Sequence, residues 1–188
     1  MESERIAEAM LSELRERGTL RQLREFASAP TATTRLGERE LIMLASNNYL
    51  DLATHPEVVE AAARGARDWG CEASGSRLIT GNLSCHRALE EELAAFCGTE
   101  AALVFASGYA INTGLIPAFL GPDDLIVVDQ LVHASIIDGA RLSRAEIAIC
   151  AHADLNAFED ALRRGRGRRV LLAVDGVYSM DGDLAPLM

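Results

Sequence analysis

The chain has 188 residues, of which 49% are hydrophobic and 24% charged, and its formal net charge is −10. This length suits one ordinary domain core, and the composition is that of a soluble globular protein. The negative charge argues against non-specific binding to nucleic acid or to an anionic membrane surface. No apolar run reaches the roughly 18 residues of a membrane span. The charged first 17 residues contain no secretory signal, so we expect a cytoplasmic protein.

Two residue types carry further information. The four cysteines form no C-x-x-C pair, which fits reduced thiols better than a disulfide framework or a zinc site. Three of the histidines share no helical spacing with each other or with the cysteines, so we expect no metal site; they are His55, His86 and His152. All 18 basic residues are arginine, and only an amine can be deprotonated to form a Schiff base with an aldehyde.

The N-terminal part reads as helix followed by a short β hairpin. Residues 2–17 have apolar side chains spaced by four, which predicts an amphipathic helix. We expect residues 20–26 to continue helically after Gly18. Residues 29–34 read as a linker, and two short β segments follow, near Arg35 and at residues 40–44.

The rest of the chain alternates between helices and strands. Helices are predicted at 56–69, 84–96, 109–119, 134–142 and 154–164, and apolar runs of strand length at 101–106, 125–128, 146–150 and 170–174. This order predicts an α/β fold with a largely parallel sheet covered on both faces. Four such strands without closing elements would leave an apolar edge open, so we expect an interrupted domain.

The first candidate site is the segment FASGYAIN at 105–112, where a strand would end and a helix begin. A helix N-terminus presents free N–H groups and a positive dipole end, which suit a phosphate. Gly108 would let the backbone approach an anion closely, and Ser107 offers a hydroxyl. The alternative is an ordinary strand-to-helix turn with a serine cap.

The second candidate is His133, which follows the strand at 125–128 and precedes a helix. Ligands of doubly wound sheets bind beyond the carboxyl ends of the strands, so His133 and Ser107 should share one side of the sheet. An imidazole there could stack on an aromatic ring or act as an acid or base. The alternative is a surface or capping histidine.

The third candidate is DGVYSMDGD at 175–183, which also follows an apolar strand. Asp175 and Ser179 would point into the same crevice, where they could orient a ring through hydrogen bonds. The alternative is a simple turn, because Asp-Gly pairs are strong turn formers. Arg21 could clamp a carboxylate through a bidentate contact, although a solvated arginine is commoner.

Five ordered segments together resemble the α-oxoamine synthases, which are pyridoxal-phosphate enzymes of fold type I. The matching stretches are SNNYLDLATHPEV (46–58), GSRLITGNLSCHRALEEELA (75–94), ALVFASGYAIN (102–112), DDLIVVDQLVHASIIDGARLS (123–143) and VDGVYSMDGDLAPL (174–187). The resemblance implies an N-terminal helical segment with a hairpin at 1–45 and an incomplete cofactor-binding large domain at 46–188. It also implies that the C-terminal half of the enzyme, including the Schiff-base lysine, lies beyond residue 188, so that these residues alone would be inactive.

The resemblance assigns roles residue by residue. Gly108 and Tyr109 match backbone amides at the cofactor phosphate, and Ser107 lies beside them. His133 matches the histidine that stacks on the pyridine ring and faces the substrate. Asp175 and Ser179 match groups beside the ring. The substrate-facing positions are Arg21 and Asn47.

The family reaction condenses an amino acid with an acyl thioester, carried on coenzyme A or acyl carrier protein, usually with decarboxylation. The ending SMDGDLAPL resembles most the members that use L-alanine and a pimeloyl thioester in biotin synthesis. Members that use glycine and acetyl, or serine and palmitoyl, are alternatives. The enzymes are homodimers, and the loop at 75–81 is expected to reach toward the neighbouring site. A truncated, non-catalytic chain that binds a partner is the alternative from another class.

One departure from the family pattern lies inside the matching segments. The family usually reads N-Y-L-G-L, whereas this chain has Asp51 at the glycine position. Aspartate tolerates unusual backbone angles better than most residues, so we expect little damage there.

Overall fold

The computed structural model describes residues 2–187 and divides into two compact units, Met1–Leu83 and Ser84–Met188. The two units reflect only how the chain packs against itself. They do not test the predicted domain boundary at residue 45, which stays a prediction. Among the described residues, no helix combines the length and the apolar character that crossing a membrane requires.

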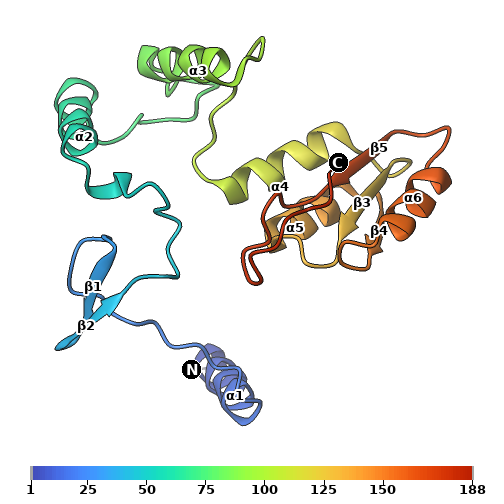
Figure 1. Ribbon diagram of the computed structural model, residues 1–188, viewed down its shortest axis with the longest axis horizontal. Coiled ribbons are helices and arrows are strands. Elements are labelled where there is room, and N and C mark those ends of the chain that lie inside the picture. Colours follow the sequence, from blue (N-terminus) through green and yellow to red (C-terminus); the bar gives the residue numbers. More distant parts are fainter. Residues whose placement is uncertain (1, 188) are drawn as a thin grey trace. The chain divides into compact units, whose positions relative to one another are not determined.

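The first unit contains the predicted helix and hairpin (Figure 1). Its elements are α1 (Glu2–Glu16), β1 (Thr33–Leu36), β2 (Arg39–Ile42), the 3-10 helix η1 (Leu52–Thr54) and α2 (Pro56–Trp69). The antiparallel pair β1–β2 turns at Gly37, whose φ of 60° lies in the left-handed region that glycine tolerates. The predicted helices at 2–17 and 56–69 and the hairpin are therefore confirmed.

Asp51 and residues 20–26 test two sequence expectations in this unit. Asp51 has φ 52° and ψ 34°, a left-handed conformation that aspartate adopts more easily than most residues, as expected. The predicted helix at 20–26 is wrong, because this segment is irregular. Gly18 ends the preceding helix with φ 65°, and Leu23 is fully exposed. A short helix gains little stability without packing, so the apolar residues at 20–26 do not suffice.

The second unit contains a three-stranded parallel sheet in the order β4-β3-β5. Its elements are α3 (Ser84–Cys97), α4 (Gly108–Phe119), β3 (Leu125–Asp129), α5 (Ala134–Ser143), β4 (Glu146–Cys150), α6 (Leu155–Arg164) and β5 (Val170–Ala173). The chain steps from β3 to β4 through α5 and returns past β3 to β5 through α6. Because parallel crossovers are right-handed, these two helices cover opposite faces of the sheet.

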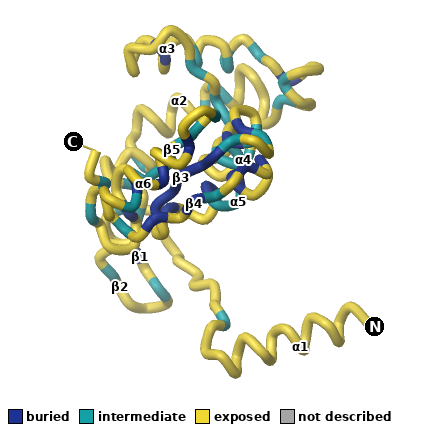
Figure 2. Tube along the Cα trace, turned by 90° about the vertical axis from the view of Figure 1, so that its right-hand side faces the viewer, coloured by how far each residue is buried: buried dark blue, intermediate teal, exposed yellow. Residues whose placement is uncertain are grey.

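The central strand β3 is buried along its whole length and supplies both faces of the core (Figure 2). Ile126 and Val128 pack in one apolar cluster with α4 and α5, whereas Leu125 and Val127 pack in another with Phe158 of α6. Side chains of a strand alternate between its faces, which explains this division. The predicted apolar strands at 125–128, 146–150 and 170–174 and the parallel sheet are confirmed.

The predicted strand at 101–106 is wrong for the described residues, since it pairs with no strand among residues 2–187. A strand requires ladder partners for its backbone groups. Here the Val104 N–H donates instead to Oε1 of Glu90 in α3, at 2.9 Å. The apolar pattern thus marks a segment suited to a sheet, but pairing decides whether it becomes a strand.

Candidate active site

A polar pocket lies at the carboxyl ends of β3 and β5, beside the N-terminus of α4. Its volume is about 410 Å³. The side chains and backbone that line it come from three separate segments and are Gly108, Tyr109, Asn112, His133, Ser135, Asp175 and Ser179. Five of the six residues predicted to bind a cofactor therefore line one pocket, and the sixth, Ser107, immediately precedes it in the chain.

The N-terminus of α4 supplies one wall of this pocket. Ser107 is the N-cap residue, and its Oγ accepts a hydrogen bond from the Ala110 N–H at 3.1 Å. The capped turn expected as the alternative is thus present. Gly108 and Tyr109 occupy the first helical positions, whose N–H groups have no acceptor within the helix. A Cβ at Gly108 would meet no atom within 4 Å, so the space beside this backbone is open to an anion.

The Tyr109 side chain is fixed by the next helix. Its hydroxyl donates a hydrogen bond to Oδ2 of Asp138 in α5, and this bond raises the pKa of the phenol above its ordinary value. Burial and the negative charge of Asp138 act in the same direction. The phenol therefore stays protonated at neutral pH and serves as a neutral donor that ties α4 to α5.

His133 is held in one orientation by Ser135 and Asn112. It is the N-cap of α5, and its Nδ1 accepts from the Ser135 N–H at 3.2 Å. The Ser135 Oγ lies 2.7 Å from the same nitrogen and accepts from Nδ2 of Asn112 at 2.8 Å. An N–H can only donate, so Nδ1 is an acceptor and the proton of the neutral ring lies on Nε2. The ring is both a cap and an exposed donor at the pocket.

Asp175 and Ser179 reach the pocket from the segment that follows β5. Oδ2 of Asp175 accepts a hydrogen bond from the His133 N–H at 2.9 Å. Ser179 lies at the turn of a small hairpin, which is closed by the bridge between Val177 and Leu184. The turn predicted as the alternative is therefore present as well, and it carries Ser179 to the same pocket as His133.

Arg21 and Asn47 belong to the first unit, and both side chains are exposed. The Tyr49 hydroxyl lies 3.5 Å from Oδ1 of Asn47 and donates to it. Their predicted role toward a substrate stays a prediction.

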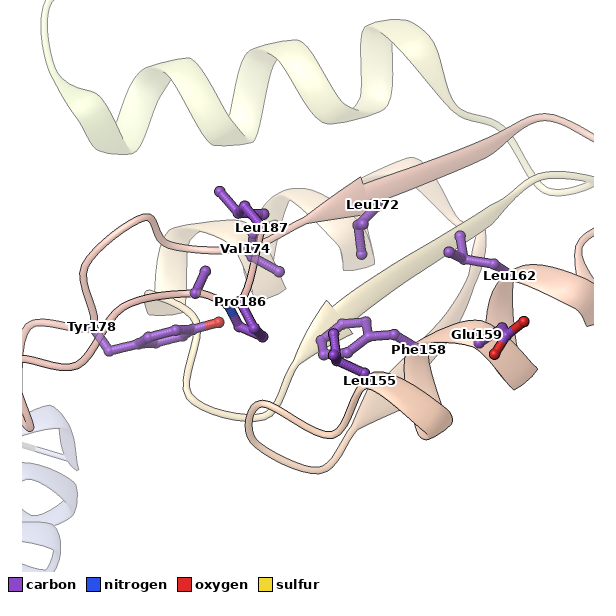
Figure 3. Close-up of a pocket in the computed structure, with 10 residues that line it drawn as sticks. Leu155, Phe158, Glu159, Leu162, Leu172, Val174, Tyr178, Pro186 and Leu187 are labelled. Atoms are coloured by element: carbon purple, nitrogen blue, oxygen red, sulfur yellow. The ribbon is translucent and has the colours of Figure 1, made fainter.

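A second pocket, of about 230 Å³, is apolar (Figure 3). Phe158 and Leu155 of α6 line it together with Leu172 and Val174 of the β5 segment. Its ionisable side chains are those of Glu159 and Tyr178. It thus offers a hydrophobic surface without the set of donors that an anionic ligand requires, and the polar pocket is the candidate active site.

Sequence reasoning did not identify four residues near this site. Asn112 and Ser135 orient His133, but their types and spacing give no signal before α4 and α5 are packed together. Asp129 and His152 form an ion pair next to the pocket segments. In the sequence, only the position of Asp129 at the end of an apolar strand could have indicated this pair.

Comparisons with known proteins agree with the fold. Residues 39–188 match the family model described as aminotransferase class I and II, and the chain belongs to this family. It is 50% identical over 178 residues to 8-amino-7-oxononanoate synthase of Geobacter sulfurreducens, covering 94% of this chain and 46% of that protein. The predicted family resemblance is confirmed.

Solved structures give the same result. The Sphingomonas wittichii serine palmitoyltransferase superposes with a TM-score of 0.84 at 33% identity, covering 97% of this chain and 46% of that one. The S. paucimobilis serine palmitoyltransferase with bound PLP-myriocin has a TM-score of 0.83 at 31% identity, covering 95% and 46%. The predicted fold type I is confirmed, and the chain spans about half the length of the relatives it matches.

Proposed function

We propose that the protein to which these residues belong is a pyridoxal-phosphate-dependent acyltransferase. It condenses L-alanine with a pimeloyl thioester, with loss of carbon dioxide, in biotin synthesis. The observation that carries this proposal is the meeting of Gly108, Tyr109, His133, Asp175 and Ser179 in one pocket. The 50% identity to 8-amino-7-oxononanoate synthase supports this substrate pair over the one used by serine palmitoyltransferases.

The residues of the pocket fit the cofactor's chemistry. The N–H groups of Gly108 and Tyr109 suit a phosphate dianion, because a helix N-terminus combines free donors with a positive dipole end. Ser107 adds its hydroxyl to the same turn. When bound, the cofactor supplies an electron-withdrawing ring that stabilises negative charge at the α-carbon of an amino acid.

The chain's own residues orient the ring and the reactants. The exposed imidazole of His133 presents a flat face for stacking and an Nε2–H for donation to a carboxylate. Asp175 fixes the backbone of His133, and Ser179 presents a hydroxyl to ring substituents. We assign Arg21 and Asn47 to substrate binding, either of the amino acid or of the acyl thioester. The thioester is carried on coenzyme A or acyl carrier protein. A guanidinium binds a carboxylate in a bidentate manner.

We also propose a cytoplasmic homodimer. The loop at 75–81 is closed tightly, since a Cβ at Gly81 would lie only 1.9 Å from the Gly75 carbonyl oxygen. It holds Leu78 and Ile79, which are 92% and 77% exposed. Exposed apolar side chains on a tightly closed loop suit contact with a second subunit. The four free thiols suit a reducing compartment.

The test is an assay of the complete gene product with L-alanine and pimeloyl-coenzyme A, in which released carbon dioxide and free thiol are both measured. We expect turnover that requires added pyridoxal phosphate. Glycine with acetyl-coenzyme A and serine with palmitoyl-coenzyme A are the comparison pairs. Faster turnover with either comparison pair would show that the assigned substrates are wrong. Complete inactivity with no cofactor binding would favour a non-catalytic protein.

A further inference from the structure

A buried carboxylate ends the central strand. Asp129 is fully buried, and its Oδ1 and Oδ2 accept hydrogen bonds from the N–H groups of Leu131 at 2.8 Å and Ala153 at 2.9 Å. Burial alone raises the pKa of this carboxyl, but the bonds from Ala153, Leu131 and His152 outweigh it and lower the pKa below its ordinary value. Asp129 is therefore a fixed negative charge inside the fold.

One imidazole bridges this charge to a second carboxylate. Nδ1 of His152 lies 3.0 and 3.1 Å from the two oxygens of Asp129, and Nε2 lies 2.5 Å from Oδ2 of Asp183. Ionised carboxylates only accept, so both ring nitrogens must carry protons for both bonds to form. The bonds to Asp129 and Asp183 raise the pKa of the imidazole, against a smaller opposing effect of burial. We define these three residues as the acid–imidazole clamp.

The far side of the clamp lies in the hairpin that carries Ser179. The Tyr178 N–H donates to the Asp183 carbonyl at 2.9 Å, and the Gly182 N–H donates to the Tyr178 carbonyl at 2.8 Å. Tyr178 is 2% exposed, and its ring meets that of His152 edge-on, with centroids 4.6 Å apart. Ser179 follows Tyr178 directly. The position of the Asp183 carboxylate is therefore coupled to the turn that holds Ser179.

From this geometry we infer that His152 is a positioning residue, which holds Ser179 at the polar pocket by joining Asp129 of β3 to Asp183 of the hairpin. Its significance for the cofactor rests on the proposed function. Asp175 anchors the base of the same segment through His133, so the segment is held at two points. The ionisable groups that face the imidazole are Asp129, Asp183 and the Tyr178 phenol.

The test uses Asp183→Asn and His152→Gln in the intact protein, with Asp181→Asn as the matched control. Asp181 is an exposed aspartate of the same hairpin, so its variant makes the same charge change outside the clamp. Asp183→Asn leaves the buried Asp129–His152 pair intact. This variant should therefore still fold even if His152→Gln does not. Hydrogen exchange of the peptide that contains Ser179 should accelerate about tenfold in both clamp variants, in line with the loss of a charged hydrogen bond. The control should match the wild type.

A spectroscopic signature separates positioning from general loosening. Histidine labelled with ¹³C gives four ring signals, and the His152 signal is identified by its loss in His152→Gln. In Asp183→Asn this signal should titrate at lower pH than in the wild type, and Asp183→Glu should restore both the titration and the slow exchange. Unchanged exchange around Ser179 in Asp183→Asn would overturn the inference.

Binding of pyridoxal phosphate, measured by equilibrium dialysis, separates this inference from the proposed function. A wild-type protein that binds none would refute the cofactor assignment, while hydrogen exchange would still decide the clamp. If the wild type binds, affinity should fall about tenfold in Asp183→Asn and stay unchanged in Asp181→Asn. Accelerated exchange with unaltered affinity would show that the clamp does not position the site.

Discussion

The backbone N–H of His133 donates to Oδ2 of Asp175 at 2.9 Å, although 42 residues separate the two in the chain. His133 follows β3 and Asp175 follows β5, and these strands are neighbours in the parallel sheet. Their carboxyl ends therefore meet at one edge, where one hydrogen bond joins the start of α5 to the hairpin segment. This bond connects two of the three segments that form the polar pocket.

Replacing Asp175 should measure this connection. Asp175→Ala removes the acceptor of the His133 N–H, and we expect a loss of about 1–2 kcal/mol in the free energy of unfolding. Asp175→Asn keeps a side-chain oxygen and should cost less. Denaturant titrations monitored by circular dichroism provide the measurement, with the exposed Asp123→Ala as control. Equal effects of Asp175→Ala and Asp123→Ala would refute the structural role of this bond.

Replacing Ser135 should weaken the preference of the His133 ring for the Nε2–H tautomer. Ser135→Ala removes one of the two donors to Nδ1 and leaves the Asn112 amide without its acceptor. We expect a fall of roughly fivefold in the ratio of the Nε2–H to the Nδ1–H form, as the loss of about 1 kcal/mol implies. The ¹⁵N shifts of the labelled ring report this ratio directly. Ser179→Ala, in the same pocket, should leave the ratio as it is.

A glycine sets the distance between α4 and α5. A Cβ at Gly139 would lie 2.3 Å from the Asn112 carbonyl oxygen and 2.9 Å from Cδ1 of Ile116, so Gly139→Ala must force the helices apart. We expect a destabilisation of about 1–3 kcal/mol. Gly65→Ala in α2 meets no atom within 4 Å and should instead stabilise its helix by about 0.5–1 kcal/mol. The midpoints of thermal and denaturant unfolding should thus shift in opposite directions in the two variants.

Sequence patterns predicted the parallel sheet and the meeting of His133 and Asp175 in one pocket, because these features follow from the order of strands and helices. Each of these residues directly follows or closely follows an apolar run, and one general rule places such positions at the same edge. The segment at 101–106 shows the limit of the pattern. Its residues suit a strand, but a strand also needs a partner, which no local pattern supplies.

The supporting contacts of the site could not be predicted in the same way. The hydrogen bond from Asn112 to Ser135 depends on the close packing of α4 and α5, which Gly139 permits. The His152–Asp129 and His152–Asp183 contacts join residues 23 and 31 positions apart. Contacts of this kind depend on side-chain geometry after folding. Residue type and spacing alone do not encode it.

The stability contributed by His152 should depend on pH. The pKa of its imidazole is raised in the folded protein by Asp129 and Asp183, so folding favours the protonated ring. This contribution is fully present below about pH 6.5, the ordinary value for histidine, and is lost as the pH rises through the higher pKa of the folded state. Asp129 behaves in the opposite way, because its lowered pKa makes its contribution disappear only as the pH falls through that value.

The difference in unfolding free energy between the wild type and His152→Gln, measured in denaturant across a series of pH values, should therefore be largest on the acidic side of neutrality. It should shrink as the pH rises through the raised pKa of the imidazole, because the wild type then loses the proton that links the two carboxylates. His55→Gln, at an exposed histidine outside the clamp, serves as a comparison for the general effect of removing a histidine. A difference that stays constant from pH 5 to pH 9 would mean that the protonated ring does not link the two carboxylates, since a neutral imidazole can donate to only one of them.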